Sequence, residues 1–211
     1  MNARIRNGLR AAIAAAAMMM AGAGAGAQTH LASLPGPSLG TTAIGAAKPL
    51  PAWSGFCQRQ PAECAVDANE PAIVTLTPRA WQLIVGVNQR VNTTIKPTTD
   101  LEHWGVPDRW DLPTDGRGDC EDFQLLKRKL LAEAGLSRRA MRMVVVVDDE
   151  AQGHAVLMIR TDRGDFILDN KVSTVLPWHR TGYVFVKRES EDAIGWVSLG
   201  GQSSPVVTAN R

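Results

Sequence analysis

The chain has 211 residues, enough for a leader and one domain with a hydrophobic core. Its 23 basic and 21 acidic residues give a formal charge of +2, but three basic residues and no acidic ones lie in the first 27 positions. The rest of the chain therefore carries a charge of −1, so the apparent basicity belongs to these first residues and nothing in the composition indicates a nucleic-acid-binding protein.

Residues 1–27 have the three parts of a secretory signal peptide. Three arginines supply positive charge, residues 11–21 form an apolar stretch, and residues 25–27 read Ala-Gly-Ala, which is typical of a cleavage site. The apolar stretch is too short to span a bilayer, and no later segment could cross one. We expect an exported protein, periplasmic or secreted, with no membrane span in the mature chain.

Residues 28–50 are rich in glycine, proline, alanine, serine and threonine and show no periodicity. This composition predicts a flexible N-terminal segment. The folded domain is then expected to comprise residues 51–211. No internal repeat is present, so we expect a single domain.

Cys57 and Cys64 are seven positions apart. In an exported protein such a pair predicts a disulfide that closes a short loop. A zinc site would need more cysteine or a nearby histidine, and His103 lies outside the usual ligand spacing. The disulfide leaves Cys120 as the free thiol.

A helix is predicted to start after Thr77 as N-cap, with Pro78 in the first helical position. Apolar residues at helical spacing continue to Ile95. Asn88 shares the inner face and Asn92 follows one turn later. A buried asparagine needs partners; hydrogen bonds to neighbouring loops are the favoured role, and polarising a substrate carbonyl is the alternative.

The irregular residues 96–118 lead into a second helix, which starts at Cys120 and ends near Gly135. We expect this loop to form one wall of a cleft. Residues 127–129, Lys-Arg-Lys, are expected on the polar side. Asp119 is a suitable N-cap, and the free N–H groups and dipole of a helix start favour a thiolate at Cys120. The apolar positions at helical spacing are Phe123, Leu126, Leu130, Leu131 and Ala134.

After Gly135 the pattern changes to strands, predicted at residues 141–147, 155–160, 165–168, 183–187 and 196–198. A hairpin turn over residues 161–164 connects the second strand to the third. Helices followed by an antiparallel sheet give an α+β fold. His154 starts one strand of the hairpin and Asp169 ends the other, so the two side chains are expected close together.

Cys120, His154 and Asp169 are the residue types of a cysteine peptidase or acyltransferase. Such an enzyme needs a thiolate, a histidine that exchanges its proton and an acid that orients the histidine. A lone histidine at a strand edge is more often structural. Together with a cysteine at a helix start and a hairpin-paired aspartate, it predicts a Cys-His-Asp triad.

Three segments of the chain resemble the bacterial transglutaminase-like cysteine proteinases, which include the LapG-type periplasmic proteases. They are residues 118–123 with Lys127, residues 153–157 and residues 168–170. The resemblance extends from Trp53 to Trp196 and covers most of the mature chain. It implies a papain-like, transglutaminase-core fold, the same triad, and cleavage of a protein substrate by an endopeptidase through a thioester.

The resemblance also implies a cofactor and partners. In LapG-type members the acids that flank the cysteine bind calcium, which points to Asp119 and Glu121. Those enzymes cut a surface adhesin and are restrained by an inner-membrane receptor for cyclic di-GMP. The segment with Cys57 and Cys64 departs from the LapG-type pattern, so a sister branch with another substrate is an alternative. Helix capping by Asp119, with the two acids after Cys120 complementing the dipole, would explain the acids without a metal.

Two other functions use the same residues or the same fold. A transglutaminase would let an amine instead of water resolve the acyl-enzyme, with an identical triad. A non-catalytic binding domain of this fold is the second alternative, and it has no chemical need for all three triad residues.

Overall fold

The computed structural model describes residues 33–203 of the chain. The predicted signal peptide, residues 1–27, lies outside the described residues. Within the described part, none of the helices has the length and apolar character needed to cross a membrane.

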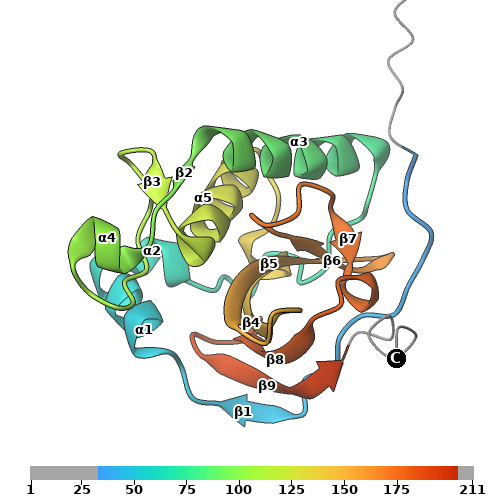
Figure 1. Ribbon diagram of the computed structural model, residues 1–211. Coiled ribbons are helices and arrows are strands. Elements are labelled where there is room, and N and C mark those ends of the chain that lie inside the picture. The colour runs from blue at the N-terminus through green and yellow to red at the C-terminus, as the bar shows by residue number, and fades with distance from the viewer. Residues whose placement is uncertain (1–32, 204–211) are drawn as a thin grey trace, which may run out of the picture. The chain divides into compact units, whose positions relative to one another are not determined.

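A seven-stranded sheet forms the centre of the domain, with its strands in the order β1-β9-β8-β4-β5-β6-β7 (Figure 1). Every neighbouring pair is antiparallel. Side chains alternate between the two faces of a strand, so Leu157 of β5 enters the larger hydrophobic cluster and Val156 enters a smaller one. The strands are β1 (Gly45–Ala47), β4 (Met141–Val147), β5 (Gly153–Thr161), β6 (Gly164–Leu168), β7 (Leu176–Pro177), β8 (Val184–Glu189) and β9 (Trp196–Ser203).

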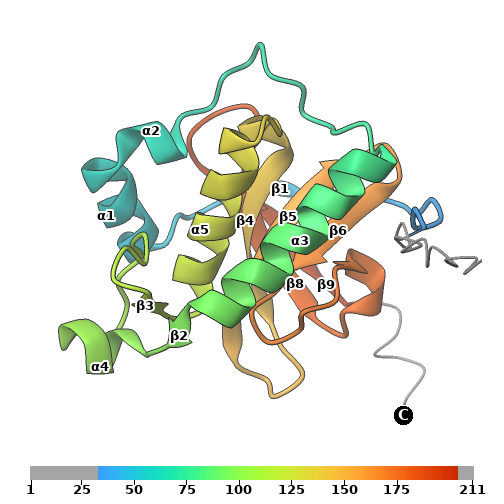
Figure 2. The same cartoon turned by 90° about the horizontal axis from the view of Figure 1, so that it is seen from above.

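Helices α3 (Pro78–Thr94) and α5 (Cys120–Glu133) lie side by side on one face of this sheet (Figure 2). Two short strands pair in parallel, and the second of them directly precedes α5. The remaining elements are α1 (Pro51–Arg59), α2 (Pro61–Cys64), β2 (Lys96–Pro97), α4 (Asp100–Trp104), β3 (Arg117–Gly118) and the 3-10 helices Arg138–Ala140 and Trp178–Arg180.

The α+β layout is confirmed, and most predicted elements have the expected places. Thr77 caps α3, since its hydroxyl accepts a hydrogen bond from the Ala80 N–H over 3.1 Å. The strand predicted over residues 141–147 has those bounds. The turn between β5 and β6 joins an antiparallel pair, as the hairpin prediction requires.

The predicted disulfide is present between Cys57 of α1 and Cys64 of α2, whose Cα atoms are 5.5 Å apart. Cys120 is a free cysteine. The bridge therefore ties two short helices together and leaves Cys120 as the free thiol, as predicted.

The segment before α1 differs from the flexible segment predicted over residues 28–50. Its described part contains β1, which pairs with β9 at the edge of the sheet. Thr41 binds Asp165 of β6 through its backbone N–H (2.6 Å) and its hydroxyl (2.8 Å). These partners are distant in the sequence, so the local composition of the segment could not reveal them.

Helix α5 buries Phe123 and Leu131 as predicted, but its buried surface is wider than the apolar positions indicate. Lys127 and Arg128, expected on the polar side, are 0% and 1% exposed, whereas Ala134 after the helix is exposed. Arg128 is buried because its Nη1 lies 2.5 Å from Oε2 of Glu189 in β8. Apolar periodicity cannot predict the burial of a charged residue whose partner comes from a distant strand.

Candidate active site

The free thiol belongs to the first residue of α5. The Thr98 N–H donates to the Gly118 carbonyl over 2.9 Å, which fixes the chain just before the helix. Gly118 is needed there because a Cβ would lie 2.7 Å from the Cβ of Asp122. Cys120 is half-buried, and its sulfur accepts a hydrogen bond from the backbone N–H of Ala155 in β5. The thiol therefore lies against the residue that follows His154.

His154 and Asp169 lie together as the hairpin geometry predicts. His154 is near the start of β5 and Asp169 directly follows β6, and the register pairs Leu157 with Leu168. Nε2 of His154 lies 2.9 Å from Oδ1 of Asp169, and both side chains are buried. Because an ionised carboxylate can only accept, the proton is assigned to Nε2, and Nδ1 is free to accept one.

Two further groups bind the Asp169 carboxylate. The Tyr183 hydroxyl donates to Oδ2 over 2.6 Å, and the Lys171 N–H donates to Oδ1 over 2.9 Å. Burial alone would raise the pKa of Asp169, but His154, Tyr183 and Lys171 together outweigh burial and lower it. The pKa of Tyr183 is raised, first by burial and then by the carboxylate that it faces. Asp169 is therefore held as an anion.

The two asparagines of α3 hold the segment that follows β6. Asn92 donates through Nδ2 to the main-chain carbonyl of Asp169 over 2.7 Å. Asn88 donates in the same way to the carbonyl of Ser173 over 2.9 Å. Both asparagines thus make the hydrogen bonds to a neighbouring loop that were the favoured prediction.

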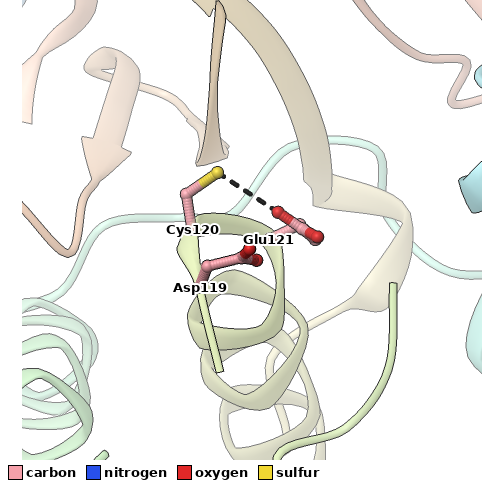
Figure 3. Close-up of side chains that lie close together, drawn as sticks. All are labelled: Asp119, Cys120 and Glu121. Atoms are coloured by element: carbon pink, nitrogen blue, oxygen red, sulfur yellow. Dashed lines mark hydrogen bonds between the residues drawn. The ribbon is translucent and has the colours of Figure 1, made fainter. Parts of the chain in front are cut away.

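The Cys120 thiol donates a hydrogen bond to Oε2 of Glu121 over 3.2 Å (Figure 3). Burial raises the pKa of the thiol well above its usual value, and the charges of Glu121 and Asp119 raise it further, whereas the Ala155 N–H lowers it. For the protein chain by itself, the expectation of a thiolate at the helix start is therefore wrong. Burial and the neighbouring acids outweigh the helix dipole.

Five carboxylates, which we call the acidic cluster, surround the start of α5. Asp119, Glu121 and Asp122 come from the helix start, and Asp100 and Asp108 come from α4 and the loop after it. Oxygens of Asp100, Asp108 and Glu121 lie within 4.8 Å of one another, as do oxygens of Asp100, Asp119 and Asp122. Among residues 33–201, no lysine, arginine or histidine forms an ion pair with any of the five.

Asp119 does not cap α5 as predicted, since its side chain makes no hydrogen bond to the helix start. Its Oδ2 accepts from the Asp100 N–H over 3.2 Å, and its Oδ1 is buried with no hydrogen-bond partner in the part of the chain that the structure describes. Oδ1 of Asp100 is also buried and without a partner. Helix capping therefore does not explain the side chain of Asp119, whereas Glu121 and Asp122 do lie in the first turn of α5.

Burial is the main cause that raises the pKa values of Asp100, Glu121 and Asp122, and repulsion between the carboxylates adds to it. The pKa of Asp122 reaches about 8. Mutually repelling carboxylates with two unpartnered buried oxygens supply the hard oxygen ligands that calcium prefers. The residues of the acidic cluster thus fit a divalent cation.

The family model of the bacterial transglutaminase-like cysteine proteinases matches residues 43–204. The chain belongs to this family. The resemblance found in the sequence is confirmed, and the chain is a transglutaminase-like cysteine protease.

Three solved structures of Legionella pneumophila LapG are similar to the chain. One is 25% identical, covers 60% of this chain and 73% of LapG, and has a TM-score of 0.49. The calcium-bound form is 20% identical, covers 70% and 90%, and has a TM-score of 0.45. The EGTA-treated form is 26% identical, covers 50% and 61%, and has a TM-score of 0.44. No curated protein matches the chain, so the family assignment rests on the family model.

Sequence reasoning missed three residues of this protease's candidate site. Tyr183, the one tyrosine of the chain, packs edge-on against His154 with ring centroids 6.0 Å apart. Asp100 and Asp108 join the acidic cluster from a loop that the sequence marks only as a cleft wall. The available signal is that this loop carries several acids and leads directly into the cysteine motif.

Proposed function

We propose that the chain is an exported cysteine endopeptidase that cleaves a protein substrate with Cys120, His154 and Asp169. The observation that carries the proposal is the position of the thiol against the N–H of Ala155, the residue after His154. The ring of His154 is in turn held by Asp169 over 2.9 Å. Nucleophile, base and orienting acid thus come from α5, β5 and the end of β6.

In the proposed mechanism, His154 accepts the thiol proton at Nδ1, because its Nε2 is bound to Asp169. The thiolate attacks the carbonyl carbon of the scissile peptide bond, and the N–H of Cys120 at the helix start stabilises the oxyanion. His154 then gives the proton to the leaving amine. Water, deprotonated by His154, hydrolyses the thioester and restores the thiol.

Asp169 has two roles in this sequence of steps. Its charge stabilises the imidazolium form of His154, and its hydrogen bond fixes the orientation of the ring. Tyr183 and the Lys171 N–H hold the carboxylate, and Asn92 holds its main chain. The base is therefore pre-positioned before a substrate arrives.

We also propose that the acidic cluster binds calcium. Asp119 and Glu121, which the family resemblance indicates, would act as ligands together with Asp100 and Asp108. Two observations support this assignment: the carboxylate oxygens lie within 4.8 Å of one another, and one oxygen each of Asp100 and Asp119 is buried without a hydrogen-bond partner among the described residues. When bound, calcium supplies positive charge beside Cys120, and Glu121 as a ligand would no longer be the acceptor of the thiol hydrogen bond.

The proposed substrate is a protein of the cell surface, such as an adhesin, and the proposed location is the periplasm or the exterior. The signal-peptide pattern of residues 1–27 and the family resemblance support both. The resemblance also suggests an inner-membrane receptor for cyclic di-GMP as the regulatory partner. A binding assay with such a receptor domain, with and without cyclic di-GMP, tests that part separately.

The main experiment incubates the purified protein with fragments of surface proteins and identifies new N-termini by mass spectrometry. We expect a small set of cleavage sites with the wild type and none with Cys120→Ala. A fluorescent primary amine in a parallel reaction distinguishes a peptidase from a transglutaminase, which would attach the amine to the substrate. Cleavage that persists in Cys120→Ala contradicts the proposal.

A further inference from the structure

A buried ammonium group without a hydrogen-bond partner lies on helix α5. Lys127 is 0% exposed, and its Nζ has no hydrogen-bond partner among the described residues. The next two residues are also cationic, but Arg128 is paired with Glu189 and Lys129 with Glu63. Lys127 is therefore the one of these three consecutive cations that no carboxylate contacts directly.

Lys127 lies on the face of α5 that is turned toward the candidate triad. It follows Cys120 by two helical turns, a spacing that puts both residues on one side of the helix. Between them, Gln124 donates through Nε2 to Oδ1 of Asn170, the residue after the triad's acid, over 3.3 Å. Nζ of Lys127 also lies 6.0 Å from the centroid of the Phe123 ring. This face of the helix thus packs against the end of β6.

Asp169 is the charged group that acts on Lys127. Burial lowers the pKa of Lys127 to about 7, and the charge of Asp169 partly opposes this. The pKa of Asp169 itself is lowered by His154, Tyr183 and the Lys171 N–H, which outweigh its burial. The other titratable groups near the pair are His154, Tyr183 and Lys171 around Asp169, and Asp148 and Asp149 beyond Tyr183.

The burial of an unpaired ammonium group is costly to the fold. A methionine at this position would fill a similar volume and avoid the cost. Stability alone therefore does not account for a lysine here. Its place beside the carboxylate that orients His154 gives the charge a functional reason.

We propose that Lys127 is a positioning residue of the triad, whose ammonium group supplies a second positive charge to Asp169 from the helix side. This charge helps to keep Asp169 ionised and available to His154. The inference rests on the proposed function of the triad. It assigns a role to a lysine that touches neither the substrate nor the thiol.

The test compares Lys127→Met with Lys129→Met, a matched control that removes a half-exposed charge two residues along the same helix. The readout is the titration of the Asp169 side-chain carboxyl carbon, followed by NMR in the isotope-labelled protein. We expect Lys127→Met to raise the pKa of Asp169 by about 0.5–1 unit and Lys129→Met to leave it unchanged. The acid limb of the cleavage profile should move to higher pH in Lys127→Met alone.

An unchanged Asp169 titration in Lys127→Met overturns the proposal. Lys127→Arg, which retains the charge, should titrate as the wild type does, and a raised pKa in Lys127→Arg would also count against it. A merely structural lysine would change the melting temperature without moving the titration. The NMR measurement needs no substrate, so it is separate from the cleavage test with Cys120→Ala, on which the peptidase function depends.

Discussion

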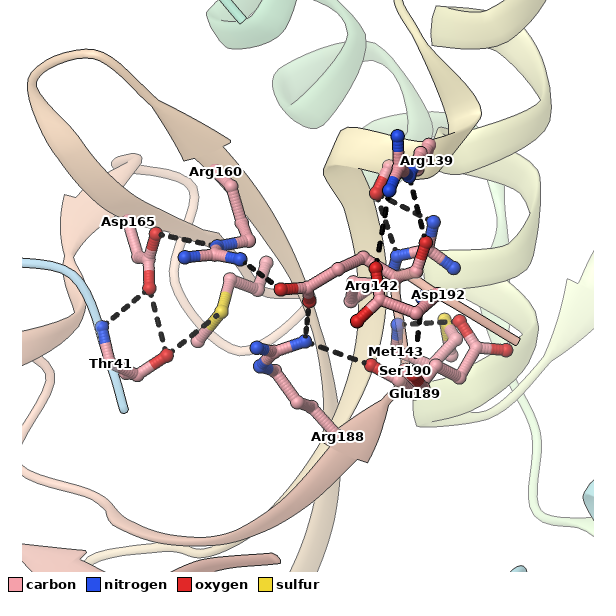
Figure 4. Close-up of polar contacts among 12 residues, drawn as sticks. Thr41, Arg139, Arg142, Met143, Arg160, Asp165, Arg188, Glu189, Ser190 and Asp192 are labelled. Atoms are coloured by element: carbon pink, nitrogen blue, oxygen red, sulfur yellow. Dashed lines mark hydrogen bonds and ion pairs between the residues drawn. The ribbon is translucent and has the colours of Figure 1, made fainter. Parts of the chain in front are cut away.

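Helix α5 contributes residues to two polar regions whose carboxylates have different neighbours. In one region the carboxylates lie beside other carboxylates, and in the other they form ion pairs with arginines. The acidic cluster at the start of the helix contains five acids, and none of them forms an ion pair with a cation of the described residues. The other region, which we call the arginine network, extends from Arg128 of α5 through β8 and the loop after it to Arg160 of β5 and Asp165 of β6. Figure 4 shows its part from Glu189 and Arg188 to Asp165. Its ion pairs are Arg128–Glu189, Arg188–Glu191, Arg160–Glu191 and Arg160–Asp165.

The pKa shifts of the two regions follow from this difference. Burial would raise the pKa of Glu191, but Arg188 and Arg160 outweigh it and lower the value. In the acidic cluster nothing outweighs burial, and the pKa of Asp122 rises to about 8. The pKa values of acids in the two regions thus shift in opposite directions. The carboxylates of the arginine network face arginine side chains, whereas those of the acidic cluster repel one another, which supports the proposal that the acidic cluster binds a cation.

The largest expected effect is the loss of cleavage when a residue of the proposed triad is replaced, which leaves both polar regions intact. Cys120→Ala should reduce cleavage by about 10³-fold or more and His154→Ala by nearly as much, because triad residues act as a unit. Asp169→Asn should lose less than either. Steady-state cleavage rates measure the losses, and circular dichroism should show an unchanged fold. Cleavage by Cys120→Ala within tenfold of the wild type, on the order of 1.4 kcal/mol of barrier, would exclude it as the nucleophile.

The arginine network is broken most directly by Arg128→Met. This change leaves Glu189 buried with hydrogen bonds from Trp53 and Met143 but without its cation. Removing one partner of a buried ion pair costs about 3–5 kcal/mol, which urea unfolding can measure. Calcium binding should be unaffected in the folded variant. A loss below 1 kcal/mol, roughly the value of an exposed pair, would show that the network is not needed for stability.

Removing calcium should change the acidic cluster alone. Calcium at 100 times its dissociation constant should stabilise the protein by about 2.7 kcal/mol, and EGTA should reverse this. Glu121→Ala should abolish the stabilisation, whereas Glu133→Gln, an exposed acid on the same helix, should retain it. Equal melting temperatures in calcium and EGTA would show that the cluster is not a calcium site.

The pH dependence sharpens the same comparison. The pKa of Asp122 is about 8 in the folded chain and near 3.8 when unperturbed. Between these values the folded chain binds a proton that the unfolded chain releases, so stability in EGTA should fall as pH rises from 4 toward 8. Calcium should remove most of this slope. Urea unfolding at several pH values measures it, and a stability in EGTA that rises across this window would contradict the assignment.

The loss of the disulfide should lower stability and have the smallest effect on cleavage of these changes. Cys57→Ser together with Cys64→Ser removes a short loop closure, which should cost about 2–3 kcal/mol. Cleavage by the folded variant should persist, because neither cysteine lies near the thiol of Cys120 in the sequence. Mass spectrometry without reduction should find Cys57 joined to Cys64. A bridge that includes Cys120 would overturn both assignments.

Much of the sheet and the candidate triad could be predicted because their signals are local. The β-branched run 141–147 and the hairpin turn fix β4, β5 and β6, and the hairpin brings His154 to Asp169. A helix start at Cys120 needs only the motif before it. These features depend on residues near one another in the sequence.

The features that could not be predicted depend on distant partners. The burial of Arg128 requires Glu189, 61 positions away. The raised pKa of the Cys120 thiol depends on how deeply it is buried, and helix position alone suggests the opposite direction. Tyr183 reaches Asp169 from the segment that enters β8. Each of these results from packing, which the order of residue types does not specify.

The most direct test of the account is to detect the acyl-enzyme. Once a cleaved fragment is known, the reaction of the wild type is quenched with acid in the steady state, and the intact protein and its peptides are weighed. The account predicts a thioester adduct on Cys120 with the mass of the N-terminal product, absent from Cys120→Ala and decaying when substrate is exhausted. Continued product formation with no adduct on Cys120 would contradict it.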